Sequence, residues 1–167
     1  LQALDDHGLA KNTLVVFASD NGAMKPGRNL PFDNYKSTVF EGGIRVPLVI
    51  RYPGHVRPGV VSHQTSLTFD LSRSFLRVAG AKNEVLQTLD GIDILEHIEK
   101  QRPDQVRTLF WRGRRGERTE RAVRHDHHKY IHRRLDDGSV HEYLFDLSKD
   151  PGETQDLRKQ QPQTVAR

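Results

Sequence analysis

Residues 14–22 have the sequence LVVFASDNG, in which an apolar, β-branched run ends in a carboxylate, an amide and a glycine. Such a run is the form expected of a strand that is covered on both faces in a mostly parallel sheet. Leu1, Leu4 and Leu9, with Gly8 placed to end a helix, predict the last turns of an amphipathic helix before it. A helix followed by a buried strand is half of a βαβ unit, so the sequence predicts an α/β fold.

The next segments continue this pattern. Residues 20–45 carry glycine, proline and charge without periodicity, and a loop of that length in a compact domain is usually functional or disordered. VPLVIRYP (46–53) predicts a second buried strand, SLTFDLSRSFLRVAG (66–80) a helix, and LDGIDILEHIEK (89–100) a short helix. The apolar face of the helix over 66–80 is predicted to consist of Leu71, Phe75 and Val78 or Ala79, with Gly80 as its end.

From about residue 105 the character of the sequence changes. Short aromatic or β-branched runs are joined by polar turns: RTLFW, RAVRHD, HKYIHRR and HEYLFDL, with LDDGS as the clearest hairpin. This part predicts a small antiparallel sheet, followed by a weakly helical tail that is broken at Pro162. We therefore predict two domains, 1–88 and 89–167.

The composition narrows the classes of function. The chain has 167 residues, 35% of them hydrophobic and 29% charged, and this is typical of a globular protein. It has no cysteine, which excludes disulfides, thiolate metal sites and a cysteine nucleophile in this chain. No apolar run has the length of a membrane span, and the start shows no signal-peptide pattern. The first residue is leucine rather than methionine, so we expect a piece of a larger protein.

Asp20 and Asn21 follow the first predicted strand, where ligands gather in open α/β sheets. Their side chains offer hard oxygen donors suited to calcium or magnesium, and Gly22 lets the backbone turn tightly. Asp-Asn-Gly is also a common turn sequence, and the residues alone favour a plain turn. Two oxygen ligands are too few for a calcium site, so further ligands would have to come from elsewhere.

Lys36 lies in the long loop, five residues before EGG (41–43). A lysine there is able to hold an anionic group as a point charge, although most loop lysines are simply solvated. The paired glycines fit a close approach of backbone segments, and Glu41 and Arg45 are placed for a local ion pair.

Histidines and arginines concentrate in the predicted sheet. His125, His127 and His128 suggest a metal site, but their cationic neighbours disfavour a further cation. The basic stretch 112–134 accounts for most of the surplus charge, which is +4 for the whole chain. Acidic residues interrupt it and no nucleic-acid motif accompanies it, so a solvated hairpin surface is the favoured interpretation.

Taken together, these segments resemble the C-terminal part of sulfatases of the arylsulfatase type. The resemblance rests on LVVFASDNG, on NLPFDNYKSTVFEGGIRVPLVIRYPG and on LFDLSKDPGETQDL, in the family's order and over nearly the whole chain. It implies the C-terminal portion of an alkaline-phosphatase-like α/β domain, followed by a small four-stranded antiparallel sheet with a terminal helix. Asp-Asn-Gly with Lys-x-x-x-x-Glu-Gly-Gly-x-Arg-x-Pro downstream makes the plain turn the weaker interpretation.

The resemblance also implies roles for individual residues. Asp20 and Asn21 match ligands of the active-site calcium, and Lys36 matches the lysine that binds the sulfate group. The family's nucleophile is a formylglycine made in a Cys/Ser-x-Pro-x-Arg motif of the N-terminal half, and no residue of this chain has that context. We expect the parent to be a sulfuric ester hydrolase, often an exported one, and this piece alone to be inactive.

Two other functions remain open at the level of sequence. The first is a phosphonate or phosphodiester hydrolase of the same superfamily. The second is a non-catalytic module that binds an acidic polysaccharide through Arg114, Arg115 and Arg118. We expect no nucleic-acid or membrane partner, and self-association through apolar strand faces that the chain itself leaves uncovered.

Overall fold

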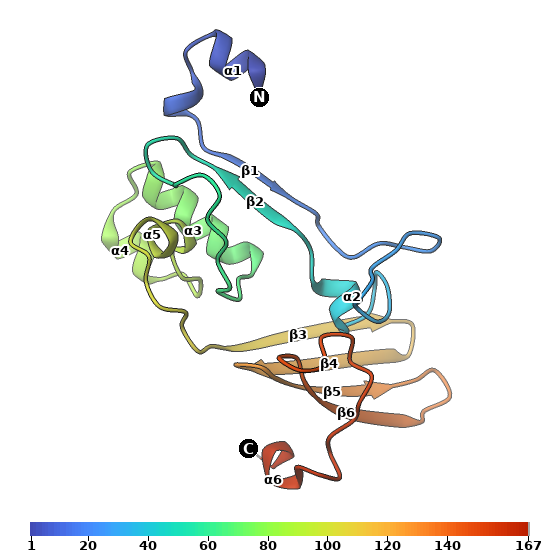
Figure 1. Cartoon of the computed structure of the whole chain (residues 1–167). Helices are drawn as coiled ribbons and strands as arrows, with labels where there is room; N and C mark the ends of the chain where they lie inside the picture. The colour runs from blue at the N-terminus through green and yellow to red at the C-terminus, as the bar shows by residue number, and fades with distance from the viewer. Residues whose placement is uncertain (167) are drawn as a thin grey trace. The chain divides into compact units, whose positions relative to one another are not determined.

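The computed structural model describes residues 1–166, which form two compact units (Figure 1). The first unit comprises Leu1–Phe17 and Val49–Gln105, and the second comprises Ala18–Leu48 and the chain from Val106 onward. The chain thus enters the second unit, returns to the first and enters the second again. These units do not coincide with the segments 1–88 and 89–167, and the predicted domain boundary stays a prediction.

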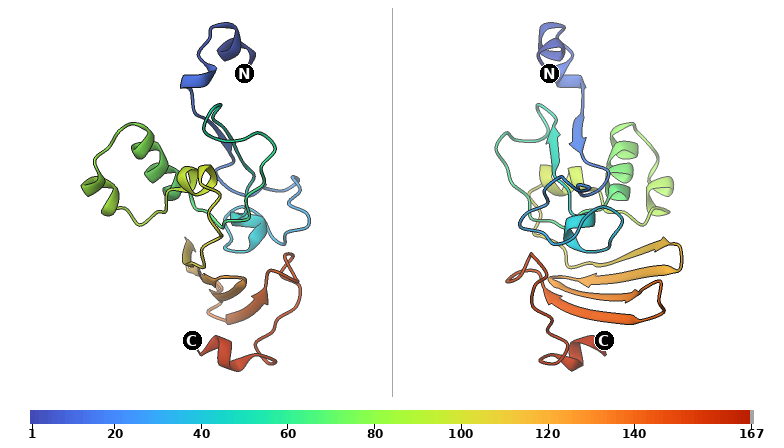
Figure 2. Two further views of the ribbon diagram at one scale, coloured as in Figure 1. Left: turned by 60° about the vertical axis from the view of Figure 1, so that its left-hand side comes forward. Right: turned by 90° about the vertical axis from the view of Figure 1, so that its right-hand side faces the viewer.

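The first unit begins with short elements. Helix α1 covers Gln2–Asp6, a 3₁₀ turn covers Ala10–Asn12, and strands β1 (Val15–Ala18) and β2 (Leu48–Arg51) pair with each other. The helix and both strands were predicted. The arrows of β1 and β2 run in opposite directions in Figures 1 and 2, so this pair is antiparallel.

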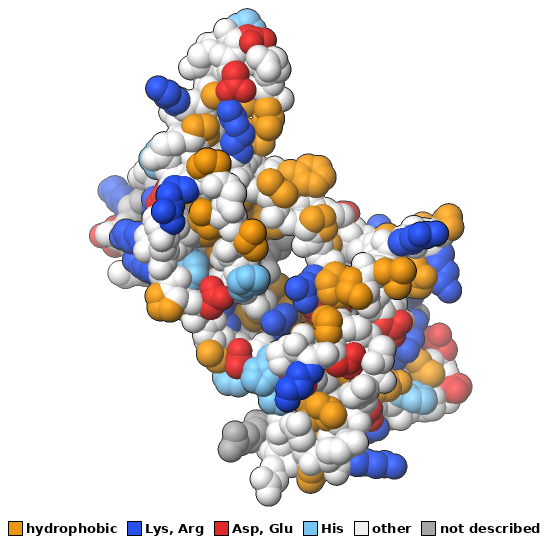
Figure 3. Space-filling model, in the orientation of Figure 1, with side chains coloured by type: hydrophobic (Ala, Val, Ile, Leu, Met, Phe, Trp, Pro, Cys, Tyr) orange, Lys and Arg blue, Asp and Glu red, His pale blue; other side chains and the backbone are white. Residues whose placement is uncertain are grey.

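Neither strand is covered on both faces. Phe17 is 66% exposed and Val49 is 59% exposed. Figure 3 shows hydrophobic side chains at the surface over the β1–β2 pair. The apolar faces of these strands are left uncovered by the described residues of this chain, as expected from the sequence. The expected apolar surface is present, and self-association through it stays a prediction. No helix among residues 1–166 is long and apolar enough to cross a bilayer.

Three helices complete the first unit: α3 (Thr68–Val78), α4 (Asn83–Gln87) and α5 (Ile94–Glu99). Helix α3 starts where the Asp70 carboxylate accepts the Leu67 N–H at 2.7 Å, and it ends before Gly80, whose φ is +82°. Its buried residues are Asp70, Leu71 and Ser74. The predicted apolar face was wrong in part, because Phe75 is 43% exposed.

The second unit contains a four-stranded antiparallel sheet in the order β3-β4-β5-β6. The strands are β3 (Thr108–Arg115), β4 (Arg118–His125), β5 (His128–Arg134) and β6 (Val140–Asp146). This sheet was predicted, including the hairpin at LDDGS, where Gly138 has a φ of +83°. The tail forms α6 (Pro162–Val165). Pro162 begins this helix and does not break it, because a first-turn position needs no N–H donor.

One face of the sheet, the inner face, is covered by the loop that precedes helix α2 (Glu41–Ile44). Val39 and Phe40 from this loop pack in one core with buried side chains of β4, β5 and β6, and Figure 2 shows α2 beside the sheet. The strand residues of this core are Ala122, Ile131 and Phe145, with Trp111 and Tyr143 at its edge. Alternation along each strand explains the selection, because every second side chain faces the loop.

A buried ion triad lies beside this core. The Lys129 side chain is fully buried, and its Nζ is 2.8 Å from Glu41 Oε1 and 2.8 Å from Glu153 Oε1. Glu153 Oε2 also accepts the Glu41 N–H at 2.6 Å. Burial raises the pKa of Glu153, and the charge of Lys129 opposes that rise. The triad therefore connects β5, α2 and the segment after β6.

We expect Lys129→Met to lower the free energy of unfolding by about 3–5 kcal/mol, because it leaves two carboxylates buried without their cation. Urea unfolding followed by circular dichroism measures the change. The matched control is Lys149→Met. The Lys149 side chain is 84% exposed, and this variant loses only the ion pair with Asp146, in which the two charged atoms are 3.4 Å apart. We expect that control to change stability by less than about 0.5 kcal/mol.

The double variant Lys129→Met/Glu41→Gln tests the coupling directly. Its loss should be smaller than the sum of the two single losses, because Lys129→Met leaves two carboxylates without their cation and Glu41→Gln then removes one of those charges. Strict additivity, or a Lys129→Met variant as stable as the wild type, would contradict a stabilising role for the triad.

Candidate functional site

The long loop of the second unit brings the two glycine motifs into contact. The Gly22 N–H donates to the Gly43 carbonyl at 3.0 Å, and the Lys36 N–H donates to the Ala23 carbonyl at 3.1 Å. A Cβ at Gly22 would lie 1.8 Å from the Gly42 carbonyl oxygen. Asp20–Asn21–Gly22 and Glu41–Gly42–Gly43 are therefore packed backbone against backbone, as the paired glycines predicted.

Asn29 holds the part of the loop between these motifs. Its Oδ1 accepts the Ala23 N–H at 2.7 Å, while its Nδ2 donates to the carbonyls of Ala23 at 3.2 Å and Asn34 at 3.0 Å. These three bonds close the loop just before Lys36. The sequence analysis missed Asn29, because an asparagine in a glycine- and proline-containing loop gives no signal beyond turn propensity.

The predicted site residues are available to a ligand. Asp20 and Lys36 are exposed, and Asn21 is half-buried. Within residues 1–166, the side chains of all three have no hydrogen-bond or ion-pair partner. The Ser19 hydroxyl donates to the Asn21 carbonyl at 2.8 Å, which bends the backbone at the end of β1. The loop thus combines fixed backbone with free polar side chains.

The side chains of Asp20 and Asn21 offer the kind of ligand atom that a hard cation binds, but they are too few to complete its coordination. A carboxylate and an amide oxygen are ligands that calcium prefers, but calcium takes six to eight oxygens. Asp20 does not belong to any group of three or more histidine, aspartate and glutamate side chains that lie close enough to share a metal, among the described residues. Asp20 and Asn21 alone do not make up a calcium site.

The loop after Lys36 is fixed on the sheet by buried carboxylates. Glu120 Oε2 accepts the Val39 N–H at 3.0 Å, and Glu153 accepts that of Glu41. Glu41 also pairs with Arg45 at 3.5 Å, which was predicted, and with Lys129, which was missed. A signal for Lys129 does exist in the sequence, because it shares the strand parity of the buried Ile131.

A hollow of about 250 Å³ is lined by Asp33 and Asn34 of this loop and by residues of the sheet and of the segment after β6. Aromatic rings of Phe40, Tyr143 and Phe145 line it together with Arg133 and Glu153. None of the three predicted site residues is among its lining residues. The hollow is therefore separate from the candidate calcium and sulfate site.

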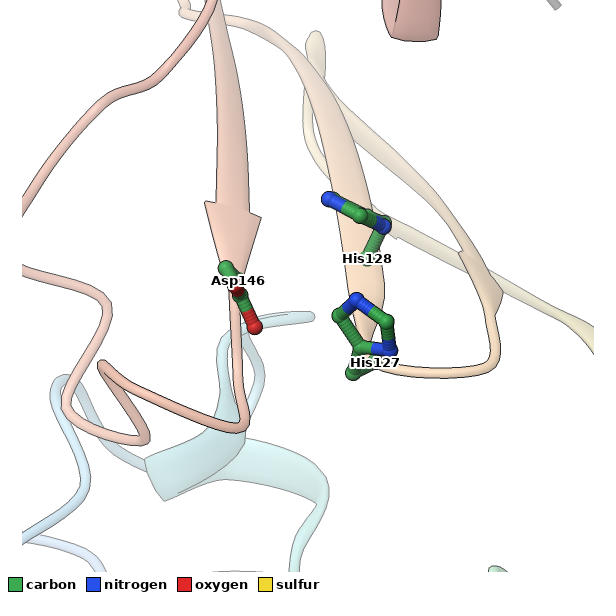
Figure 4. A group of neighbouring side chains, drawn as sticks. All are labelled: His127, His128 and Asp146. Atoms are coloured by element: carbon green, nitrogen blue, oxygen red, sulfur yellow. The ribbon is translucent and has the colours of Figure 1, made fainter.

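Two histidines, His127 and His128, lie where β5 begins, close to Asp146 at the end of β6 (Figure 4). Ligand atoms of His127, His128 and Asp146 lie within 4.8 Å of one another. Asp146 already accepts from the hydroxyl and N–H of Ser148, at 2.5 and 3.1 Å, and these bonds lower its pKa. Lys149 Nζ stands 3.4 Å from the same carboxylate. This cationic, internally bonded setting agrees with the reasoning that disfavours a metal here, and the absence of a metal role stays a prediction.

Comparisons of this sequence with protein families and with individual proteins lead to the same family. Residues 31–166 match the family described as N-sulphoglucosamine sulphohydrolase, C-terminal. The mouse (Mus musculus) N-acetylgalactosamine-6-sulfatase is 39% identical over 119 residues, which are 68% of this chain and 23% of that protein. A sulfatase of Formosa agariphila is 35% identical over 170 residues, 93% of this chain and 30% of that protein. The chain therefore spans less than a third of the length of these relatives.

Solved structures agree with the sequence relatives. The structure of Ps i-CgsB in complex with k-i-k-neocarrahexaose is similar with a TM-score of 0.84 and 28% identity, over 98% of this chain and 36% of that one. The phosphonate monoester hydrolase of Agrobacterium radiobacter has a TM-score of 0.67 at 23% identity, over 99% of this chain and 35% of that one. The second likeness concerns the fold alone.

We expect Gly22→Ala to open the contact between the two glycine motifs, because its Cβ would overlap the Gly42 carbonyl. Amide hydrogen exchange at Gly22 and Lys36 should become at least about tenfold faster. Gly113→Ala is the matched control, since a Cβ there would meet only Val39 Cγ1 at 4.0 Å. Unchanged exchange in Gly22→Ala would show that the motifs do not depend on this close approach.

Proposed function

The chain belongs to the sulfatase family, and from that membership we propose that it supplies one part of the calcium and sulfate site of a sulfuric ester hydrolase. The observation that carries the proposal is the contact between the Asp-Asn-Gly and Glu-Gly-Gly motifs, which leaves Asp20, Asn21 and Lys36 in one loop with free side chains. The remaining ligands and the formylglycine nucleophile would come from sequence outside these 167 residues.

In this proposal Asp20 and Asn21 hold the metal with side-chain oxygens. A calcium ion bound there would neutralise sulfate oxygens as negative charge moves toward the leaving alkoxide. Because two donors do not complete a calcium site, the isolated chain should bind calcium weakly and should not hydrolyse sulfate esters.

Lys36 has a separate role in the proposal. Its ammonium is a compact point charge with three donors, suited to hold a sulfate oxygen without depending on planar geometry. The Lys36 N–H is bonded to the Ala23 carbonyl, so the backbone from which the side chain extends is fixed. Fixed placement matters because a cation stabilises developing charge best when it does not need to reorganise.

The substrate class proposed here is a sulfated sugar. Two observations support it: the mouse relative is named N-acetylgalactosamine-6-sulfatase, and k-i-k-neocarrahexaose is present in the structure of Ps i-CgsB. The alternative is a phosphonate or phosphodiester hydrolase, which shares the fold. The sequence relatives favour the sulfatase, because the mouse and Formosa agariphila sulfatases are 39% and 35% identical to this chain, and the likeness to the phosphonate monoester hydrolase, at 23% identity, concerns the fold alone.

The test joins this chain to the N-terminal part of a sulfatase relative and measures hydrolysis of a chromogenic aryl sulfate. Lys36→Ala should lower kcat/KM by about 10²–10³-fold, as expected for loss of a charge that stabilises the transition state. Lys25→Ala is the matched control, because Lys25 is exposed in the same loop and lies 5.0 Å from the Tyr35 ring. The control should change kcat/KM by less than about threefold.

Aryl phosphate and phosphonate esters in the same assay separate the two hydrolase classes. Faster hydrolysis of the phosphorus esters than of the sulfate would favour the alternative. Equal rates for wild type and Lys36→Ala would remove the role given to this lysine. Hydrolysis by the unjoined chain would contradict the incomplete site.

A further inference from the structure

The face of the four-stranded sheet opposite Val39 and Phe40 carries a concentration of arginine. We call it the outer basic face. It consists of the side chains that alternate with the core residues along β3, β4 and β5: Phe110, Arg112, Arg114, Arg121, Val123, Tyr130, His132 and Arg134. All four arginines are exposed. Leu144, on the same face of β6, is buried, so the open part of the face lies over the first three strands.

The register of the strands places like charges side by side. Arg112 is directly opposite Arg121, and the same row continues with the imidazole of His132 on β5 and the carboxylate of Glu142 on β6. Among the described residues, no carboxylate pairs with Arg112, Arg121 or Arg134. Like charges directly opposite each other destabilise a sheet. The fold therefore tolerates a repulsion that an anionic ligand would relieve.

Arginines on the inner face behave differently. Arg118 and Arg133 both contact the buried carboxylate of Glu120, Arg133 at 2.8 Å. Their charge is neutralised inside the protein and is not offered to a ligand. Of Arg114, Arg115 and Arg118, which the sequence suggested as binding residues, Arg118 lies on the inner face and pairs with Glu120, and binding by the three stays a prediction.

The geometry of the outer basic face suits a polymer better than a single ion. Positions across neighbouring strands are about 5 Å apart, and alternate positions along one strand are about 7 Å apart. Arg112, Arg114 and Arg121 thus form a flat array of separate cations. Phe110, which is 71% exposed, and Tyr130 add apolar rings on which a sugar ring is able to pack.

We propose that the outer basic face binds a sulfated polysaccharide chain and so holds the polymer that carries the scissile sulfate. The choice of a sulfated polysaccharide rests on the function proposed above, while the charge array is independent of it. Guanidinium groups match oxyanions through several N–H donors, and repeated sulfates match repeated arginines. Binding is electrostatic, so it is expected to weaken steeply with salt.

The experiment measures binding of heparin to the full chain by isothermal titration calorimetry in about 0.1 M salt, where the screening length is about 10 Å. Arg112→Gln/Arg121→Gln should weaken binding about tenfold. The matched control is Arg57→Gln/Lys82→Gln, which removes the same charge from exposed positions of the first unit. It should weaken binding less than about twofold.

The stability of the variants supplies a second readout. Without polymer, Arg112→Gln/Arg121→Gln should unfold at the same or a higher temperature than the wild type, because the variant loses a repulsive pair. Heparin should raise the unfolding temperature of the wild type more than that of this variant, since a ligand stabilises the state that it binds. A variant that fails to fold would itself contradict the repulsion and overturn the proposal.

Several outcomes would overturn the proposal. Equal loss of affinity in the two double variants would mean non-specific attraction to net charge. Single-stranded DNA that binds as tightly as heparin would mean a general polyanion surface or a nucleic-acid surface. Loss of heparin binding in Lys36→Ala would place the polymer at the candidate site instead. Because no step here requires hydrolysis, a failed sulfatase assay leaves this result unaffected, and the two proposals fail separately.

Discussion

The ammonium group of Lys129, fully buried between the carboxylates of Glu41 and Glu153, fixes the loop of the candidate site on the four-stranded sheet. Removing three charges from water is costly, and only close pairing and further hydrogen bonds offset that cost. Glu153 supplies such a bond to the Glu41 N–H. One small group of side chains therefore sets where α2 begins, and the position of α2 sets where Gly42 and Gly43 meet Gly22.

The parts that could be predicted from the sequence are those with local causes. The antiparallel sheet follows from alternating runs and the turn at Gly138, and the close approach of the motifs follows from paired glycines. The partners of Glu41 could not be predicted in this way, because they lie 88 and 112 residues away along the chain. What would lie against the exposed face of β1 could not be predicted either, since a run of apolar residues shows what a strand is able to bury and not what lies against it.

The alternation of side chains along a strand explains why some arginines of the basic stretch are paired with a carboxylate and others are not. Between residues 112 and 134 the arginines alternate between the face on which Glu120 is buried and the opposite face of the sheet. Glu120 neutralises Arg118 and Arg133, while Arg112 and Arg121 stand opposite each other without a carboxylate. Composition alone merges these two groups into one charged patch. The pairing register separates a structural charge cluster from an exposed group of arginines.

Exposure by itself does not mark Asp20, Asn21 or Lys36 as functional, because an unpaired polar group in water costs nothing. These side chains differ from those of an ordinary turn because, within residues 1–166, they have no partner while the backbone around them is held by hydrogen bonds. Neighbouring amides are bonded across the loop, Asn29 makes three bonds to the same segment, and a side chain at Gly22 would not fit. A solvated turn needs none of this order. A site that must hold charge without reorganising needs all of it, because positions fixed before binding are what make electrostatic stabilisation effective.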